Sequence, residues 1–273
     1  MVFPRGACDA HMHFYDDSYP ISPAALLRPP AASPEQYAVV QTQLGLDRAV
    51  VVQPTTYGLD NQCQLAGMAT LGGRARGVVV VDQSATRSRL SELNDVGVCG
   101  VRFHMLPGGM LPWDQMPTIA AKVADFDWHV QLQLNGRDLS ERAKELHDLP
   151  GQLVIDHVGR FTPPVGTNHR SFVALATLLD AGDTWVKLSA PYESKGDGPP
   201  SYDDVTVLVR ELVRRWPQRC LWATNWPHPG QIQPPTVDNL ERLLQHWIPD
   251  QGTQHQILVL NPEAVYGFDP ATR

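Results

Sequence analysis

Short runs of consecutive apolar residues recur along the whole chain, and they predict buried β-strands. Eight runs are found, at Ala7–Phe14, Arg48–Pro54, Arg76–Asp82, Gly100–Met105, His129–Leu134, Leu153–Val158, Thr184–Ala190 and Cys220–Trp226. Runs of this kind are typical of parallel strands covered by helices, because both faces of such strands are buried. The pattern therefore predicts a parallel sheet with helices on its outside.

Segments compatible with helices separate these runs. They cover residues 34–44, 60–71, 84–96, 114–126, 138–148, 170–181, 203–216 and 237–249, and a short closing helix is expected at Asn261–Phe268. Ser33 before Pro34 is a typical helix start, since serine caps the first turn and proline suits the first helical position. Eight alternations of strand and helix predict an α/β protein, a (β/α)8 TIM barrel. A doubly wound sheet is the alternative, but its glycine-rich phosphate-binding loop is absent.

Composition narrows the class of protein further. The chain has 273 residues and 42% of them are hydrophobic, which suits one TIM-barrel domain over residues 1–273, since such barrels take about 250 residues. The net charge of −7 and the absence of a basic run argue against nucleic acid and anionic membrane surfaces as partners. We find no signal peptide, no membrane span and no paired cysteines. We therefore expect a cytoplasmic protein with a small-molecule substrate, and a homo-oligomer stays open.

Polar residues occur at the ends of the predicted strands. In a (β/α)8 barrel this end carries the active site. Alternate residues of a strand share a face, so His11 and His13 point the same way, as do Arg102 and His104. A single histidine here is more often structural, but so many polar side chains buried under helices would cost several kcal/mol. The convergence of the whole set therefore indicates a functional site.

Three stretches then resemble landmarks of the amidohydrolase superfamily. They are Asp9–His13 (Asp-Ala-His-Met-His), Val154–His157 (Val-Ile-Asp-His) and Trp222–His228 (Trp-Ala-Thr-Asn-Trp-Pro-His). The resemblance spans nearly the whole chain and is closest to the lactone-acting branch, which includes lactone hydrolases and lactone isomerases. Within that branch the isomerases look nearer, on the stretches Leu106–Gly109, Gln133–Gly136 and Tyr192–Ser194 and on Asn225.

The resemblance also bears on the metal. Metal-using members join the His-x-His pair to a Lys or Glu on strand four, histidines on strands five and six, and an Asp on strand eight. Here Gln133 and Asn225 occupy two of these places, and a neutral amide is a poor zinc ligand and no general base. We therefore expect no cofactor. If a divalent metal such as zinc is bound, His11, His13 and His157 are its expected ligands.

The resemblance implies an enzyme that acts on a carboxylated lactone, most simply a sugar-acid lactone, by isomerisation or by ring-opening hydrolysis. Because Asn225 stands in place of an aspartate base, attack by a hydroxyl of the substrate itself is favoured. The expected catalytic residues are His11, His13, His157, Lys187 and Asn225, and the expected substrate-binding residues are Arg102, His104, Gln133, Gln53, Tyr192 and His228.

Two alternatives to this function stay open at the level of sequence. One is a hydrolase of a pyrone or muconolactone type of lactone from aromatic degradation. The other is a non-catalytic barrel that binds a small molecule. Gly108 and Gly109 also predict that the loop Met105–Trp113 is a mobile lid.

Overall fold

Eight parallel strands form one sheet in the computed structural model, which describes residues 3–270. The strands are β1 Cys8–Met12, β2 Arg48–Val52, β3 Ala75–Val79, β4 Val98–His104, β5 His129–Gln133, β6 Leu153–Ile155, β7 Thr184–Leu188 and β8 Cys220–Trp222. Each strand pairs in parallel with the next one along the chain. The predicted TIM barrel is therefore confirmed, with strands somewhat shorter than the apolar runs.

The sheet closes between its first strand and the segment that follows its last strand. His13 N donates a hydrogen bond to Trp226 O at 2.9 Å, and Asn225 N donates to His11 O at 2.9 Å. The two histidines of β1 are therefore fixed to the residues after β8 by main-chain hydrogen bonds. This closure brings the first and the last polar segments of the sequence to the same place.

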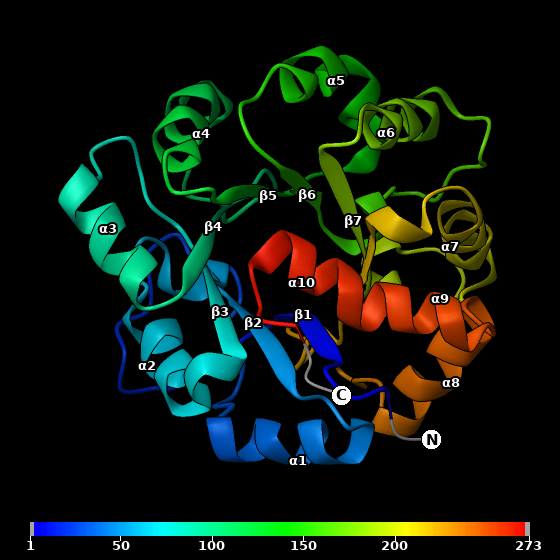
Figure 1. The fold of residues 1–273 in the computed structure, drawn as a ribbon, viewed down its shortest axis with the longest axis horizontal. Coiled ribbons are helices and arrows are strands. Elements are labelled where there is room, and N and C mark those ends of the chain that lie inside the picture. Colours follow the sequence, from blue (N-terminus) through cyan, green and yellow to red (C-terminus); the bar gives the residue numbers. More distant parts are fainter. Residues whose placement is uncertain (1–2, 271–273) are drawn as a thin grey trace.

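Helices surround the sheet (Figure 1). They are α1 Pro34–Leu44, α2 Gln62–Leu71, α3 Arg87–Asp95, α4 Met116–Ala124, α5 Leu139–His147, α6 Arg170–Ala181, α7 Asp203–Arg215, α8 Val237–Trp247, α9 Gln251–His255 and α10 Asn261–Tyr266. The Ser33 side chain accepts a hydrogen bond from Gln36 N, as a capping serine should. Among residues 3–270, no helix is both long enough and apolar enough to cross a membrane.

The C-terminal segment covers the end of the barrel where the strands begin. Figure 1 shows α10 lying across the middle of the ring, and α10 ends at Tyr266, slightly before the predicted end of the closing helix. The guanidinium groups of Arg48 and Arg76 stack on the ring of Phe268, at 5.3 and 4.5 Å from its centroid. With this end packed, the opposite end, where the strands finish, is left for a site.

Candidate active site

All eleven residues predicted for the site lie at the C-terminal ends of the strands or in the loops that follow them. Nine are buried, namely His11, His13, Gln53, Arg102, Gln133, His157, Lys187, Asn225 and His228, and the other two, His104 and Tyr192, are partly buried. They form two groups. The larger group surrounds Asp156, and the smaller one joins Asn225 to the loop after β7.

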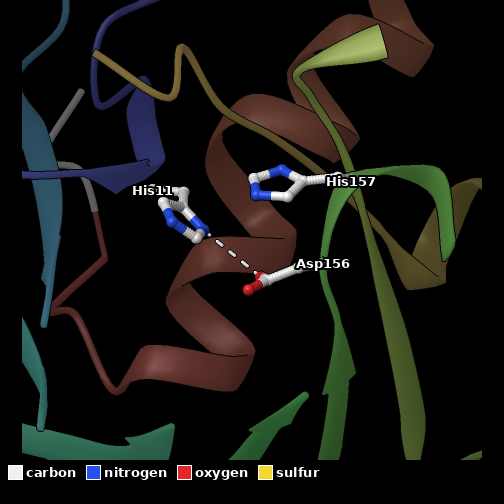
Figure 2. Close-up of side chains that lie close together, drawn as sticks. All are labelled: His11, Asp156 and His157. Atoms are coloured by element: carbon white, nitrogen blue, oxygen red, sulfur yellow. Dashed lines mark hydrogen bonds and ion pairs between the residues drawn. The ribbon is translucent and has the colours of Figure 1, made fainter. Parts of the chain in front are cut away.

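His11 lies at the centre of the larger group. Its Nδ1 lies 3.2 Å from Asp156 Oδ1, and its ring is 4.8 Å from the ring of His157 (Figure 2). Its other nitrogen, Nε2, lies 3.2 Å from His13 Nε2. His13 Nδ1 is 2.7 Å from Val52 O, to which it donates, so His13 Nε2 carries a lone pair. Burial holds the pKa of His11 well below its ordinary value.

The neutral ring of His11 has one proton to divide between its two nitrogens. A proton on Nδ1 serves the contact with the Asp156 carboxylate, and a proton on Nε2 serves the contact with His13. When Nδ1 has no proton it can instead accept, because Lys187 Nζ and the Gln131 amide nitrogen each lie 3.4 Å from it. Both tautomers of the neutral ring therefore find partners, and burial disfavours a second proton.

Asp156 is held between two cations. Lys187 Nζ lies 3.4 Å from Asp156 Oδ1, and an Arg102 nitrogen lies 3.6 Å from Asp156 Oδ2. Burial alone would raise the pKa of Asp156, but Lys187 and His11 outweigh it, and its pKa lies well below the usual range. Burial lowers the pKa of Lys187 to about 8. Two cations against one carboxylate leave this part of the site with a net positive charge.

His157 is oriented by its backbone and by Ser189. Its φ of 54° lies in the left-handed region, which a histidine rarely adopts and which costs of order 1 kcal/mol or more. Its Nδ1 lies 2.8 Å from Ser189 Oγ, which leaves Nε2 as the nitrogen for a substrate. Burial lowers the pKa of His157 to about 4, so the ring is neutral near pH 7 and can accept a proton.

Arg102 is already engaged by the protein. It donates to Gln53 O at 2.8 Å and to Gln133 Oε1 at 2.6 Å, and His104 Nδ1 lies 3.2 Å from the same Gln133 oxygen. Each terminal nitrogen of the guanidinium therefore has a protein partner, while Nε has none in the part of the chain that the structure describes. The predicted role of Arg102 as a clamp for a substrate carboxylate stays a prediction.

Asn225 begins the smaller group. Its Nδ2 donates to Tyr192 OH at 2.9 Å, and Tyr192 OH lies 3.1 Å from His228 Nδ1. Asn225 and His228 have φ values of 60° and 64°, so the backbone here is bent to bring both side chains to the barrel mouth. With Nδ2 taken, the Asn225 carbonyl oxygen is the end of the amide that can accept a hydrogen bond from a ligand.

The sequence did not indicate the supporting role of Asp9, and it favoured Gln131 as a contact for sugar hydroxyls, whereas Gln131 contacts Lys187 and Asp156. Asp9 accepts from Thr224 N at 2.9 Å and from Tyr37 OH at 3.0 Å, which joins β1 to the residues after β8. Gln131 Oε1 accepts from Lys187 Nζ at 2.6 Å, and its amide nitrogen donates to Asp156 Oδ2 at 3.1 Å. Alternation on β5 was the available signal, because residues 131 and 133 share a face.

A divalent metal does not fit this donor set well. The side chains that come together as possible ligands are His11, Asp156 and His157, whose ligand atoms lie within 4.8 Å of one another. Asp156 takes the place that the sequence gave to His13. It is also the anion that Lys187 and Arg102 neutralise. A doubly charged ion here would put three positive groups against one buried carboxylate, which Coulomb repulsion opposes.

The model of the family described as Amidohydrolase matches residues 8–268. The chain belongs to the amidohydrolase family. This amidohydrolase is 34% identical to the D-galactarolactone isomerase of Agrobacterium fabrum, over 98% of the chain and 94% of that protein. It is 33% identical to a 2-pyrone-4,6-dicarbaxylate hydrolase of Comamonas testosteroni, over 96% of the chain and 90% of that protein. An apo crystal structure from Agrobacterium tumefaciens superposes with a TM-score of 0.93 at 33% identity, over 98% of each chain.

Proposed function

We propose that this amidohydrolase rearranges the lactone of a sugar acid by intramolecular acyl transfer, and that ring opening by water is the lesser outcome. The observation that carries the proposal is the double neutralisation of Asp156 by Lys187 and Arg102. A carboxylate so strongly stabilised as an anion is a poor base for water. Neutral imidazoles are left to move protons, and Asn225 has no carboxylate to offer. The named activity of the Agrobacterium isomerase agrees with this chemistry.

The reaction can be written with this chain's own residues. A hydroxyl oxygen of the substrate attacks the lactone carbonyl carbon, and its proton passes to His157 Nε2. The tetrahedral intermediate then expels the original ring oxygen, which takes the proton back from His157. One C–O bond forms and another breaks, no water is consumed, and His157 returns to its neutral form. The proximity of the hydroxyl to the carbonyl supplies much of the rate.

The positive charge of the site assists the step in which the oxyanion forms. Lys187 and Arg102 exceed Asp156 by one charge, so a negative tetrahedral intermediate is stabilised by a field that exists before the reaction. His11 contributes the proton-dependent contact with Asp156. The Asn225 carbonyl oxygen can accept a hydrogen bond from a second hydroxyl of the substrate and so orient the sugar, while the attacking hydroxyl donates to His157 Nε2. Tyr192 holds that amide in place.

We further propose that the enzyme works without a metal. The charge count around Asp156 supports this, because Lys187 already supplies the cation that a carboxylate needs. The test is elemental analysis of purified protein combined with activity before and after chelation. We expect less than one-tenth equivalent of zinc and no loss on chelation. Stoichiometric metal, with activity lost on chelation and restored by zinc, would overturn this part.

The function itself is tested by NMR on a panel of aldaro- and aldonolactones. Exchange between rings of different size is the expected result, and ring-opened acid is the signature of hydrolysis. His157→Gln should abolish exchange. His147→Gln is the matched control, because His147 lies exposed on α5 and far from the strand ends. If no lactone in the panel changes, the proposed function is wrong.

A further inference from the structure

A small cavity lies beside the main group of site residues, between the end of β2 and the loop after β4. Gln53, Arg102 and His104 form its polar wall, and Gly109–Leu111 lie over it. Its volume is about 10 Å³, which is room for about one water-sized group. A single hydroxyl group matches a space of this size.

Two of the residues that line this cavity each have a buried polar atom with no hydrogen-bond partner among residues 3–270. The atoms are Gln53 Oε1 and Arg102 Nε, and the two side chains are 0% and 5% exposed. A buried polar atom without a partner costs about 1–3 kcal/mol, so such atoms in an enzyme are usually paired by water or by a ligand. The two atoms are of opposite kinds, one an acceptor and one a donor.

The orientation of the Gln53 amide is fixed by the protein. Its Nε2 donates to Gly58 O at 3.0 Å and to Asp60 O at 2.8 Å. Both partners are carbonyl oxygens, so the nitrogen must face them and the oxygen must face the other way. Gln53 Oε1 is therefore free to accept a hydrogen bond on its other side. Arg102 Nε is a donor, because the Nε of a charged guanidinium carries a hydrogen and has no lone pair that accepts.

His104 adds a second acceptor to the cavity wall. Burial and the neighbouring Arg102 lower the pKa of His104 to about 3, so the ring is neutral near pH 7. Its Nδ1 lies 3.2 Å from Gln133 Oε1 and donates to it, because that oxygen can only accept. His104 Nε2 is then left as an acceptor. A carboxylate or a ring carbonyl has no hydrogen to donate, so neither could form a hydrogen bond with these two acceptors.

We propose that the cavity formed by Gln53, Arg102 and His104 is a subsite for one hydroxyl group of the substrate, and that it selects hydroxylated lactones over lactones that lack this hydroxyl. A hydroxyl donates one hydrogen bond and accepts another, which is what Gln53 Oε1 and Arg102 Nε require. The inference rests on the proposed function for its substrate class. It assigns Arg102 a hydroxyl contact through Nε in place of a carboxylate clamp.

The loop that contains Gly109–Leu111 closes the cavity on one side. A Cβ atom built on Gly109 would lie 1.8 Å from His104 O, so the loop backbone packs directly against the end of β4. Only glycine permits this approach. A substrate hydroxyl in the cavity would therefore be enclosed by the loop 105–112, and a mismatched group would hold that loop open.

Binding of an unreactive analogue tests the subsite without relying on turnover. The probes are a hydroxylated cyclic ether carboxylate, in which a CH₂ group replaces the lactone carbonyl, and its single-deoxy forms, titrated by calorimetry. We expect one deoxy form to bind the wild-type enzyme at least tenfold more weakly than the parent probe. Gln53→Met should reduce this difference to less than threefold, because the acceptor is gone.

The control is Asn61→Ala. Asn61 joins the loop after β2 to the end of β3, through Leu59 O and Val80 O, but does not line the cavity. This variant should therefore weaken all probes while keeping the tenfold difference. Equal binding of all deoxy forms to the wild-type enzyme would overturn the subsite, and so would an unchanged difference in Gln53→Met. The wild-type comparison stands even if Gln53→Met fails to fold. If lactones do not react while the hydroxyl-dependent binding is present, the proposed function fails and the subsite does not.

Discussion

Replacement of Lys187 by methionine separates the functional role of the buried charge from its effect on stability. Lys187 is fully buried, with Nζ 2.6 Å from Gln131 Oε1 and 3.4 Å from Asp156 Oδ1. Methionine keeps most of the side-chain volume and removes the charge. The variant therefore alters the electrostatics of the site while leaving its packing nearly intact.

Two opposing contributions set the expected change in unfolding free energy. The pKa of Lys187 falls from 10.5 to about 8, which corresponds to about 3 kcal/mol by which folding disfavours the charged form. The variant is relieved of that cost. That net shift already includes the attraction between Lys187 and Asp156. Against this relief, Gln131 Oε1 loses its donor and is left buried without it, which costs about 1–3 kcal/mol. The variant is therefore expected to be as stable as the wild type, or more stable by up to about 2 kcal/mol.

The pH dependence of stability has a definite sign. Between about pH 8 and 10.5 the unfolded chain holds the Lys187 proton and the folded chain does not, so this group makes stability rise with pH there. Below pH 8 the cost of the buried charge is present in full, and above 10.5 it is absent. The difference in stability between wild type and Lys187→Met should therefore grow in favour of the wild type over this range.

Urea unfolding and lactone kinetics together provide the assay. We expect kcat to fall about 100-fold, because a charge aimed at the oxyanion is lost, while stability changes little. Lys144→Met is the control, since Lys144 forms an exposed pair with Asp148 on the surface and solvent screens such pairs, so they contribute little to stability. Full activity in Lys187→Met would refute the role of the charge. A loss of more than about 4 kcal/mol would refute the balance of the two terms.

Four further outcomes are expected. The pH profile of kcat/KM should rise through about pH 4 as His157 loses its proton and fall above about pH 8 as Lys187 does, and a flat profile from pH 3 to 10 would contradict both assignments. Asn225→Asp should add a carboxylate base beside Tyr192 and yield ring-opened product detectable by NMR; its absence would argue against a missing base. Gly109→Ala should raise KM at least tenfold, because a Cβ would clash with His104 O, and unchanged kinetics would show that the loop need not pack there. Lys187→Met should bind zinc more tightly than the wild type in a competition titration, because Asp156 then lacks one of its two cationic partners. Equal zinc affinity would contradict the idea that Lys187 supplies the positive charge that a metal would otherwise supply.

The sequence predicted the barrel well because its signals are local. The helix at 34–44 was predicted to the residue, since Ser33 and Pro34 mark its start and Gly45, with φ of 73°, ends it. The sixth strand was predicted too long. It ends at Ile155, because His157 and Val158 adopt left-handed backbone angles that turn the chain toward the barrel mouth. Such a turn depends on tertiary contacts and leaves no mark in the apolar pattern.

The sequence predicted that the side chains of the site lie at one end of the barrel, but not how they pair with one another. Strand alternation places Arg102, Lys187 and His157 at one end of the barrel. Which of them neutralises Asp156 depends on how β4, β6 and β7 are staggered around the closed sheet, and on the Gln131 amide between them. The engagement of Arg102 by Gln53 and Gln133 is likewise a product of side-chain conformation. For Arg102 the difference is largest, because the sequence favoured a clamp for a substrate carboxylate and the structure places its terminal nitrogens against Gln53 and Gln133.

The most direct test of the account is an NMR time course of sugar-acid lactones with enzyme that elemental analysis shows to be free of metal. We expect exchange between lactone rings of different size, with the acid form appearing more slowly, and loss of exchange in His157→Gln. Exchange that requires added zinc would contradict the role assigned to Lys187 and Asp156. Exclusive ring opening by water would contradict intramolecular acyl transfer.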